Sequence, residues 1–364
     1  MRLVVLPGDG VGPEVTTAAV RVLRAAFASR GLPLDIATRA VGWAAVQTEG
    51  APLTDDTIDA CRAADAVLLG AVGHPDAEHA PAHLRPEAGL LALRQALGCW
   101  GNLRPARVPD GLIGASALRA DRARGTDLVV VRELGGGLYY GEPRGDDRGR
   151  AWNTLSYTED EVRRIAHLAF RVASERRRRV TSVDKANVLE TSKLWRRVAE
   201  EVALQYPEVI FESMLVDRAA MELALRPSRF DVVLTSNLFG DILSDQAAGV
   251  VGSLGALGSA SVGGDTDLYE PVHGSAPDIA GTGRANPMGA IASVTLMLRT
   301  TGGLPELADD IDASVEACLG DGLRTDDLAT PADASPPVGT HAFTSAVVDR
   351  LGARVSRRVV GGAA

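Results

Sequence analysis

The chain has 364 residues, of which 46% are hydrophobic and 23% charged, and its formal net charge is -9. A chain of this length is expected to fold into two domains, each of about 100–200 residues and with an ample hydrophobic core. The negative charge speaks against a nucleic-acid-binding protein and against binding to an anionic membrane, but local arginines could still hold a small anionic substrate.

The first residues and the cysteines bear on the compartment. The chain starts with an apolar run over 1–6, which ends at Pro7. The run is too short for a signal peptide or a membrane span. The cysteines, Cys61, Cys99 and Cys318, form no CxxC pair, and their odd number suits a reducing compartment. We therefore expect a cytoplasmic protein that binds no membrane.

Short apolar runs alternate with helical patterns along the chain. We predict buried strands at 3–6, 66–69, 127–131 and 230–234, and helices at 14–30, around 58–61 and from about Gly240. This alternation is typical of an α/β fold with a mostly parallel sheet. We also predict an exposed hairpin tip or loop at 144–150, a solvated helix end at 174–179 and a frayed tail at 361–364.

The glycine-rich segment from Gly8 to Gly12 follows the first strand and precedes a helix, as a dinucleotide-binding fingerprint would. The fingerprint needs a glycine at position 13, where this chain has Pro13, and no clear acidic residue ends the next strand. We interpret the segment as a tight turn. The helix that follows could still lie near a negatively charged cofactor group.

The strongest candidate site is the segment from Asn237 to Asp245. Asp241 and Asp245 are four residues apart on a predicted helix, so their carboxylates share one face and repel each other unless a cation lies between them. The alternative is a solvated pair at a helix start. The segment follows a buried strand, where α/β proteins bind ligands, and carboxylate oxygens suit Mg²⁺ or Mn²⁺. Asp217, after another apolar run, is a candidate third ligand.

Arg94, Arg104 and Arg132 form a second group of candidates, and Arg132 stands at the end of a predicted strand. Arginine binds carboxylates through two parallel hydrogen bonds and keeps its charge. Together the three could hold a dicarboxylate. Each of them taken alone could instead be an ordinary surface ion-pair partner.

Tyr139 and Lys185 are candidates for an acid–base pair. The chain has two lysines, Lys185 and Lys193, among many arginines, and lysine can release a proton near neutral pH where arginine cannot. For action near pH 7, the pKa of both Tyr139 and Lys185 would have to lie below its ordinary value. The alternatives are a packing role for Tyr139 and chance survival for the lysines, which we favour for Lys193.

The segment 270–281, with Asn286 after it, is rich in glycine, proline and small residues, so that a flat ligand could approach closely. Asp278 could accept hydrogen bonds from a ribose diol and would repel a 2′-phosphate, which favours NAD over NADP. His273 could instead be a structural loop histidine.

Together these segments resemble the β-decarboxylating dehydrogenases, the family of 3-isopropylmalate, isocitrate, homoisocitrate and tartrate dehydrogenases. The resemblance runs from Leu3 to about Thr344 and is greatest to the members that act on 3-isopropylmalate. It is carried by the motifs LPGDGVGPEV, RPEAGLLALR, NLRPA, VRELGGGLYYGEPRG, SVDKANVLE, NLFGDILSD and EPVHGSAPDIAG. It implies two α/β domains without a standard Rossmann fold, namely a cofactor-binding domain (1–99 and 252–364) and a substrate, metal and dimerisation domain (100–251).

The resemblance also implies an activity, the NAD-dependent oxidation and decarboxylation of 3-isopropylmalate to 4-methyl-2-oxopentanoate and CO2 in leucine biosynthesis. Lys185 would act as the base on the substrate hydroxyl, and Tyr139 would protonate the enol carbon. The substrate would be bound by Arg94, Arg104, Arg132, Asp217, Leu90, Leu91, Val188 and Asn187. Mg²⁺ or Mn²⁺ would be bound by Asp217, Asp241 and Asp245, and NAD by Glu87, His273, Gly274, Ser275, Ala276, Asp278 and Asn286.

Members of this family are homodimers with shared active sites, so Lys185 and Asp217 are expected to serve the partner's site. The chain departs from the family pattern at Trp43, at the loop 74–82, and at Gly135, Val251 and Gly258. The loop could line the active site, so an enzyme for tartrate, D-malate or another 3-substituted malate is an alternative. A non-catalytic subunit is a third hypothesis, which the presence of the acid–base pair and all three carboxylates disfavours.

Overall fold

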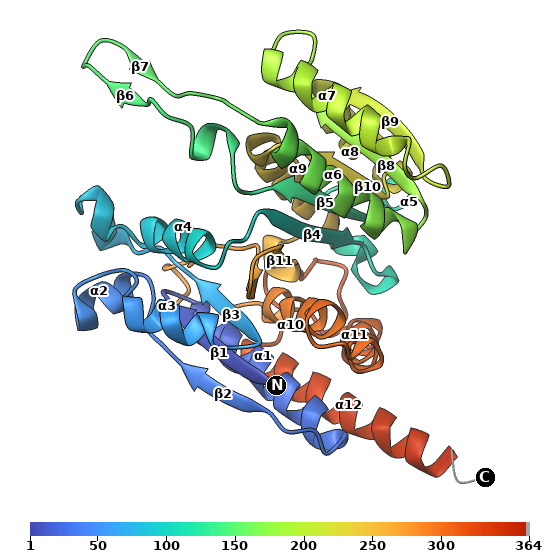
Figure 1. The fold of residues 1–364 in the computed structure, drawn as a ribbon. Helices are drawn as coiled ribbons and strands as arrows, with labels where there is room; N and C mark the ends of the chain where they lie inside the picture. Colours follow the sequence, from blue (N-terminus) through green and yellow to red (C-terminus); the bar gives the residue numbers. More distant parts are fainter. Residues whose placement is uncertain (362–364) are drawn as a thin grey trace. The chain divides into compact units, whose positions relative to one another are not determined.

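The computed structural model describes residues 1–361, with side chains up to residue 354, so the tail predicted at 361–364 lies beyond the described residues apart from Gly361 (Figure 1). The chain divides into two compact units. The first comprises Met1–Gly98, Pro109–Ala115 and Gly252–Ala364, and the second Cys99–Val108 and Ser116–Val251. Among the described residues, no helix is both long enough and apolar enough to cross a membrane.

A mostly parallel sheet with the strand order β2-β1-β3-β12-β11 lies in the first unit. Its strands are β1 (Arg2–Gly8), β2 (Asp35–Thr38), β3 (Ala66–Ala71), β11 (Gly258–Val262) and β12 (Asp267–Pro271). β1 runs parallel to β2 and β3, and β12 runs parallel to β3 but antiparallel to β11. The order differs from the 3-2-1-4-5-6 order of a Rossmann sheet, so the predicted α/β class without a standard Rossmann fold is confirmed.

Helices cover the sheet of the first unit. They are α1 (Gly12–Ser29), α2 (Trp43–Glu49), α3 (Asp55–Arg62), α4 (Pro86–Ala96), α10 (Met288–Thr300), α11 (Pro305–Gly320) and α12 (Thr340–Gly361), with short 3₁₀ turns at Pro75–Ala77, Ala82–Leu84, Asp110–Ala115 and Leu254–Ala256. α1 packs beside α12 and against β3, while α10 contacts β11, β12 and α11. β3, whose sequence is AVLLGA, is buried along its whole length, as expected for a strand in a covered parallel sheet.

The glycine-rich turn after β1 packs against the protein's own backbone. Gly8 and Gly10 have φ angles of 73° and 57°, in the left-handed region that favours glycine. An added Cβ would lie 1.9 Å from the Ala71 carbonyl oxygen at Gly8, and 2.0 Å from the Ser275 carbonyl oxygen at Gly10. The glycines therefore allow close packing within the chain, which fits a tight turn.

The second unit contains a sheet with the strand order β4-β5-β10-β8-β9 and a small hairpin. The sheet strands are β4 (Gly101–Arg107), β5 (Asp127–Glu133), β8 (Arg179–Asp184), β9 (Ile210–Leu215) and β10 (Val232–Thr235), and the hairpin strands are β6 (Gly145–Asp146) and β7 (Ala151–Trp152). β4 runs antiparallel to β5, and the pairs from β5 to β9 are parallel. The hairpin confirms the tip predicted at 144–150.

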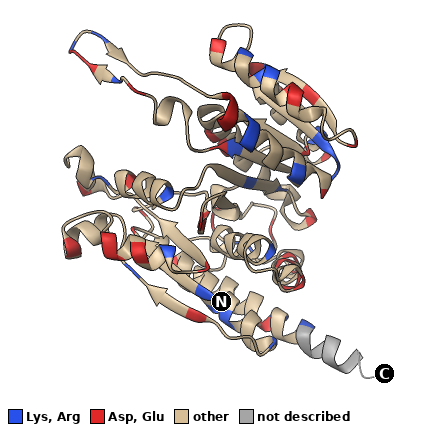
Figure 2. Cartoon of the chain, viewed as in Figure 1, with Lys and Arg blue, Asp and Glu red and all other residues tan. Residues whose placement is uncertain are grey.

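The helices of the second unit are α5 (Ala120–Ala123), α6 (Glu159–Ser174), α7 (Glu190–Ala203), α8 (Val216–Leu225) and α9 (Asn237–Val251), with 3₁₀ turns at Gly137–Tyr139 and Pro227–Arg229. α6 and α7 cover one face of the sheet, and α8 and α9 cover the other (Figure 1). A capping box between Thr158 and Glu161 begins α6. Basic and acidic residues intermix along α6 and α7 (Figure 2), where Arg197 pairs with Glu159 and Glu201.

The predicted solvated helix end at 174–179 is wrong in one respect. α6 does end at Ser174, but Arg176 then donates hydrogen bonds to Asp231 (2.9 Å) and Asp127 (2.7 Å), next to the starts of β10 and β5. Asp231 is buried, and a buried carboxylate needs a counter-charge. Arg176 therefore ties the helix end to the sheet.

All three cysteines are buried. Burial raises the pKa of the Cys61 thiol to about 12 and also raises the pKa of Cys318. A thiol is reactive as the thiolate, so Cys61 and Cys318 serve packing rather than chemistry.

Candidate active site

Four predicted site segments follow the ends of neighbouring parallel strands in the second unit. Arg132 lies at the end of β5, Asn237 begins the helix after β10, Lys185 follows β8, and Asp217 follows β9. The register places Arg132 opposite Thr235 in β10, so the strand ends are level. Parallel α/β sheets bind ligands beyond the carboxyl ends of their strands. The candidate residues of this unit therefore lie along the edge where a ligand is expected.

The carboxylates of Asp241 and Asp245 converge on one arginine. Arg104 Nη1 lies 3.4 Å from an oxygen of each, and Arg132 Nη1 forms a close ion pair with Asp241. Burial acts to raise the pKa of Asp241, but Arg132, the Tyr139 hydroxyl and Arg104 outweigh it, so this pKa lies below its usual value. Burial raises the pKa of Asp245. The cation required between the two carboxylates is thus supplied at least in part by arginine.

Tyr139 belongs to the same cluster. Its hydroxyl donates a 2.7 Å hydrogen bond to Asp241, and the Arg132 guanidinium lies 5.4 Å from the centre of its ring. Burial and the Asp241 carboxylate raise the pKa of Tyr139, so within this chain the lowered pKa that action near pH 7 would require is not present. The hydroxyl is therefore protonated at neutral pH, which is the state that a proton donor needs.

Lys185 pairs with Asp217, 2.5 Å from Nζ to Oδ1, and its backbone N–H donates to Ser192 (3.1 Å). The bond from Lys185 lowers the pKa of Asp217. Among the described side chains, which extend to residue 354, no three histidine, cysteine or acidic groups gather closely enough to hold a metal ion. Asp217 therefore does not join Asp241 and Asp245 within one chain. Beside Lys185, Asn187 and Val188 form an exposed turn in which Val188 is 64% accessible.

One face of α4, in the first unit, carries four predicted residues. Leu90 and Leu91 each lie three or four positions from both Glu87 and Arg94, so the four residues lie along one face of the helix. Arg94 is buried and donates to Glu270 in β12, 2.6 Å from Nη2 to Oε1. The predicted substrate arginine therefore already has a carboxylate partner that the sequence did not reveal.

Residues near Gly73 connect Glu87 to the predicted cofactor loop. A Cβ added at Gly73 would lie 3.2 Å from the Ser275 hydroxyl and 3.6 Å from Glu87 Oε1, so the two predicted cofactor residues flank the same glycine. The Gly73 N–H donates to Asp9 (2.9 Å), a buried residue with no role in the predictions.

Asp9 also accepts hydrogen bonds from the backbone N–H groups of Trp43 (3.0 Å) and Ala44 (2.9 Å) at the start of α2. Trp43 stacks on His74, with ring centroids 5.9 Å apart and an interplanar angle of 13°. Two departures from the family pattern, the tryptophan and the loop after Gly73, thus contact each other.

A groove of about 590 Å³ in the first unit contains most of the predicted cofactor residues. Its lining includes His273, Gly274, Ala276 and Asn286. The sequence reasoning missed the other residues that line it, namely Val11, Leu254, Gly255, Ile279, Arg284, Ala285, Asp326 and Asp327. Asn286 donates to Asp327, 3.0 Å from Nδ2 to Oδ2. The volume of the groove is typical of a small-molecule site.

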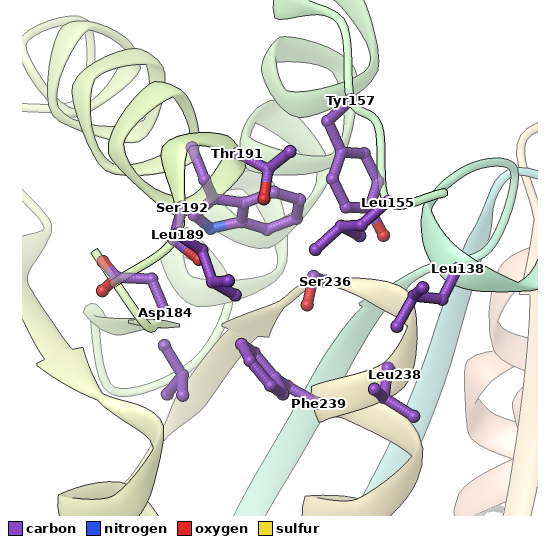
Figure 3. A pocket seen from close by; sticks show the side chains of 12 residues that line it. Leu138, Leu155, Tyr157, Asp184, Leu189, Thr191, Ser192, Ser236, Leu238 and Phe239 are labelled. Carbon is purple, nitrogen blue, oxygen red and sulfur yellow. The ribbon is translucent and has the colours of Figure 1, made fainter. Parts of the chain in front are cut away.

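The second unit has a much smaller apolar pocket of about 60 Å³ (Figure 3). Leu138, beside Tyr139, and Asp184, beside Lys185, lie on opposite sides of it, and Trp195 and Phe239 form part of its lining. The volume accommodates a few water molecules but not a branched dicarboxylic acid.

Several polar residues around the arginines were also missed. Arg104 donates to Asn102 (2.8 Å) and Ser244 (2.8 Å), and Arg132 donates twice to Asn237. Asn102 and Ser244 lie inside the quoted motifs, but their spacing from Arg104 gives no sign of contact. Helix α9 begins at Asn237, earlier than the predicted Gly240, and the Asn237 N–H donates to the Tyr157 hydroxyl (2.9 Å).

Comparison with known proteins gives the relationship of the chain. The family model for isocitrate/isopropylmalate dehydrogenase matches residues 2–349. The chain belongs to this family. It is 52% identical over 360 residues to the 3-isopropylmalate dehydrogenase of Halalkalibacterium halodurans, covering 97% of this chain and 98% of that one. With the enzyme of the same name from Chlorobium chlorochromatii it shares 50% identity over 350 residues, or 96% and 99% of the two chains.

Solved structures in the isocitrate/isopropylmalate dehydrogenase family share the fold. Isocitrate dehydrogenase from Methylococcus capsulatus has a TM-score of 0.85 and 37% identity, covering 96% of this chain and 99% of that chain. A β-decarboxylating dehydrogenase from Thermococcus kodakarensis has a TM-score of 0.80 and 35% identity, covering 98% and 97%. The resemblance inferred from the motifs is therefore confirmed, and the family includes enzymes named for different substrates.

Proposed function

We propose that the chain is a 3-isopropylmalate dehydrogenase, which uses NAD to convert 3-isopropylmalate to 4-methyl-2-oxopentanoate and CO2 in leucine biosynthesis. The observation that carries the proposal is the face of α4, where Leu90 and Leu91 lie between Glu87 and Arg94. Two leucines suit a branched alkyl group and are poor partners for the third carboxylate of isocitrate. The names of relatives that share half of their residues with the chain support the same choice.

The groove around His273 supports NAD as the cofactor. Burial lowers the pKa of His273, so its ring is neutral, and Nδ1 lies 2.8 Å from the Gly274 carbonyl oxygen, to which only an N–H can donate. Nε2 is then an acceptor, and it is buried without a partner. An adenine amino group would satisfy it. Asp278, Asp326 and Asp327 would disfavour the 2′-phosphate of NADP.

Asp241 and Asp245 suit a divalent cation, because two carboxylates four residues apart converge at one point. A third carboxylate, Asp217, would have to come from a second chain. Mg²⁺ or Mn²⁺ bound there would act as a Lewis acid and stabilise negative charge on the substrate oxygens.

The chain's own residues would then bind the substrate and move protons. Arg104 and Arg132 would hold carboxylate groups, together with Arg94 once it shares its bond to Glu270. Lys185 would accept the proton of the substrate hydroxyl. NAD bound in the groove would supply the hydride acceptor. After CO2 leaves, the protonated Tyr139 would donate to the carbon that carried it.

The arrangement of Lys185 and Asp217 favours a homodimer in which each chain completes the other's site. Exposed apolar side chains on α8 and α9 offer a surface for the second chain, namely Met221, Leu225 and Ile242. Patches of this kind mark contacts between proteins.

The test is NADH formation with Mg²⁺ or Mn²⁺ across 3-isopropylmalate, D-malate, tartrate, isocitrate and homoisocitrate, with NADP as the alternative cofactor. We expect the highest kcat/KM for 3-isopropylmalate with NAD, and loss of activity with excess chelator. Leu90→Ala with Leu91→Ala should reduce the preference for 3-isopropylmalate over D-malate by about 10- to 200-fold. Equal kcat/KM for 3-isopropylmalate and D-malate in the unaltered protein would remove the leucine-pathway assignment, and inactivity with every acid would favour a non-catalytic subunit.

A further inference from the structure

Asn237 is a fully buried amide whose two ends serve different parts of the candidate site. Its Oδ1 accepts hydrogen bonds from Arg132 Nε (3.0 Å) and Nη2 (2.8 Å). Its Nδ2 donates to the carbonyl oxygen of Gly136 (3.0 Å), with Leu134 at 3.5 Å. Arginine can only donate and a carbonyl can only accept, so the amide has a single possible orientation.

On one side, Asn237 fixes the Arg132 guanidinium. Arg132 is only 2% exposed, and its remaining nitrogen, Nη1, pairs with Asp241. Because Oδ1 receives both Nε and Nη2, the plane of the guanidinium cannot rotate without losing two hydrogen bonds. The direction in which Arg132 presents Nη1 is thus determined by Asn237.

On the other side, Asn237 fixes the loop that carries Tyr139. This loop, residues 134–139, is held at its start by Glu133, which accepts from the N–H groups of Gly135 (2.8 Å) and Gly136 (2.9 Å). Asn237 holds the carbonyl of the same Gly136. The next residue, Gly137, has φ 77° and packs on Tyr157, so the approach to Tyr139 is already constrained.

We propose that Asn237 is a positioning residue that couples the substrate arginine Arg132 to the proton donor Tyr139. The inference rests on the proposed function for the roles of these two residues. Both of them contact Asp241, Arg132 through Nη1 and Tyr139 through its hydroxyl. One amide therefore fixes both groups that orient the same carboxylate, and its acceptor and donor ends can be changed separately.

Two variants separate the two ends. Asn237→Asp keeps the acceptor for Arg132 but sets a carboxylate against the Gly136 carbonyl, whereas Asn237→Ser is too short for either bond. Aspartate and serine have helix propensities close to that of asparagine, so α9, which begins at Asn237, is expected to form in both variants. The matched control is Gln246→Met, which removes a side-chain amide bond from the same helix to the Ala220 carbonyl (2.6 Å).

We expect Asn237→Asp to lower kcat by about 10²-fold, because a displaced proton donor loses its alignment, while KM for 3-isopropylmalate changes little. Asn237→Ser should lower kcat and also raise KM by roughly tenfold, because Arg132 loses its orientation. In a Tyr139→Phe background, Asn237→Asp should change kcat by less than about threefold, since coupled residues are not additive. Gln246→Met should leave both constants near those of the unaltered protein.

Hydrogen exchange of residues 134–141 gives a readout that needs no activity. Faster exchange in Asn237→Asp than in Gln246→Met is expected, and equal exchange would overturn the loop half of the proposal. Unchanged KM in Asn237→Ser, or full additivity with Tyr139→Phe, would overturn the coupling. If the unaltered protein prefers a different malate, that result refutes the substrate assignment but not the coupling. The same variants are then measured with the preferred malate.

Discussion

At the scale of single residues, the two lysines of the chain have different surroundings. Lys193 forms an exposed pair with Glu190 (2.6 Å), whereas Lys185 is more enclosed and pairs with Asp217 at the edge of the sheet. Exposed pairs of the first kind contribute about 0–1 kcal/mol to stability. The difference in surroundings makes one lysine a natural control for the other.

Lys185→Met should lower kcat by about 10²- to 10⁴-fold, because the substrate hydroxyl loses its base. Lys193→Met should leave kcat unchanged. The measurement is steady-state NADH formation with saturating NAD, metal and 3-isopropylmalate, after thermal unfolding has shown that both variants fold. A Lys185→Met enzyme as active as Lys193→Met would exclude the base role.

The sequence predicts those contacts of the site that join residues close together along the chain, and it does not predict contacts between distant residues. The pairing of Asp241 with Asp245 follows from their spacing on a helix, so it could be predicted. The contacts of Arg104 with Ser244 and of Arg94 with Glu270 join residues 140 and 176 positions apart, and no local pattern encodes them. The raised pKa of Tyr139 likewise depends on burial and on Asp241, which only the fold brings to it.

At the scale of elements, continuous apolar runs predicted the buried strands well because each strand is covered on both faces. β3, β5 and β10 lie where such runs occur. The start of α9 and the role of Arg176 were not predictable, because a hydroxyl from Tyr157 and a buried carboxylate at Asp231 decide them. Local patterns thus give the type of an element, and distant side chains set its ends.

The helix pair α6–α7 contains a histidine that should make stability depend on pH. His167 lies on α6, 3.0 Å from the Tyr206 hydroxyl, and burial together with Arg171 and Arg163 lowers its pKa. The unfolded chain, in which histidine has a pKa of about 6.5, therefore binds the proton more readily. His167 therefore leaves the free energy of unfolding unchanged above about pH 6.5. The free energy of unfolding decreases as the pH falls through the lower pKa that His167 has in the folded protein.

In His167→Gln, which can still accept a hydrogen bond from Tyr206, the thermal midpoint should fall less between neutral pH and mildly acidic pH than in the unaltered protein. The control is the same change at His79, which is exposed in the first unit. Parallel pH curves for the unaltered protein and His167→Gln would contradict the assignment.

At the scale of the whole molecule, the positions of Lys185–Asp217 and of Asp241–Asp245 suggest that one chain does not complete a site. In the proposed homodimer each site takes Lys185 from one chain and Asp241, Asp245 and Tyr139 from the other. A dimer of one Lys185→Met chain and one Asp245→Asn chain then contains one intact site.

Each of these variants alone should be inactive, and refolding an equal mixture should restore about a quarter of the unaltered activity, because half of the dimers are mixed and each has one working site. Mixing Asp245→Asn with Tyr139→Phe, whose changes fall on the same side of the site, should restore nothing. The measurement is NADH formation after co-refolding. Recovery in neither mixture would place the whole site within one chain.

The burial of Cys61, Cys99 and Cys318 has a practical consequence for labelling. Maleimide and disulfide reagents react with exposed thiolates, and these three thiols are buried. The natural chain can therefore serve as a background for a single introduced cysteine, for example at His79 in the loop that departs from the family pattern. A fluorophore or spin label attached there would follow that loop during turnover without prior removal of the native cysteines.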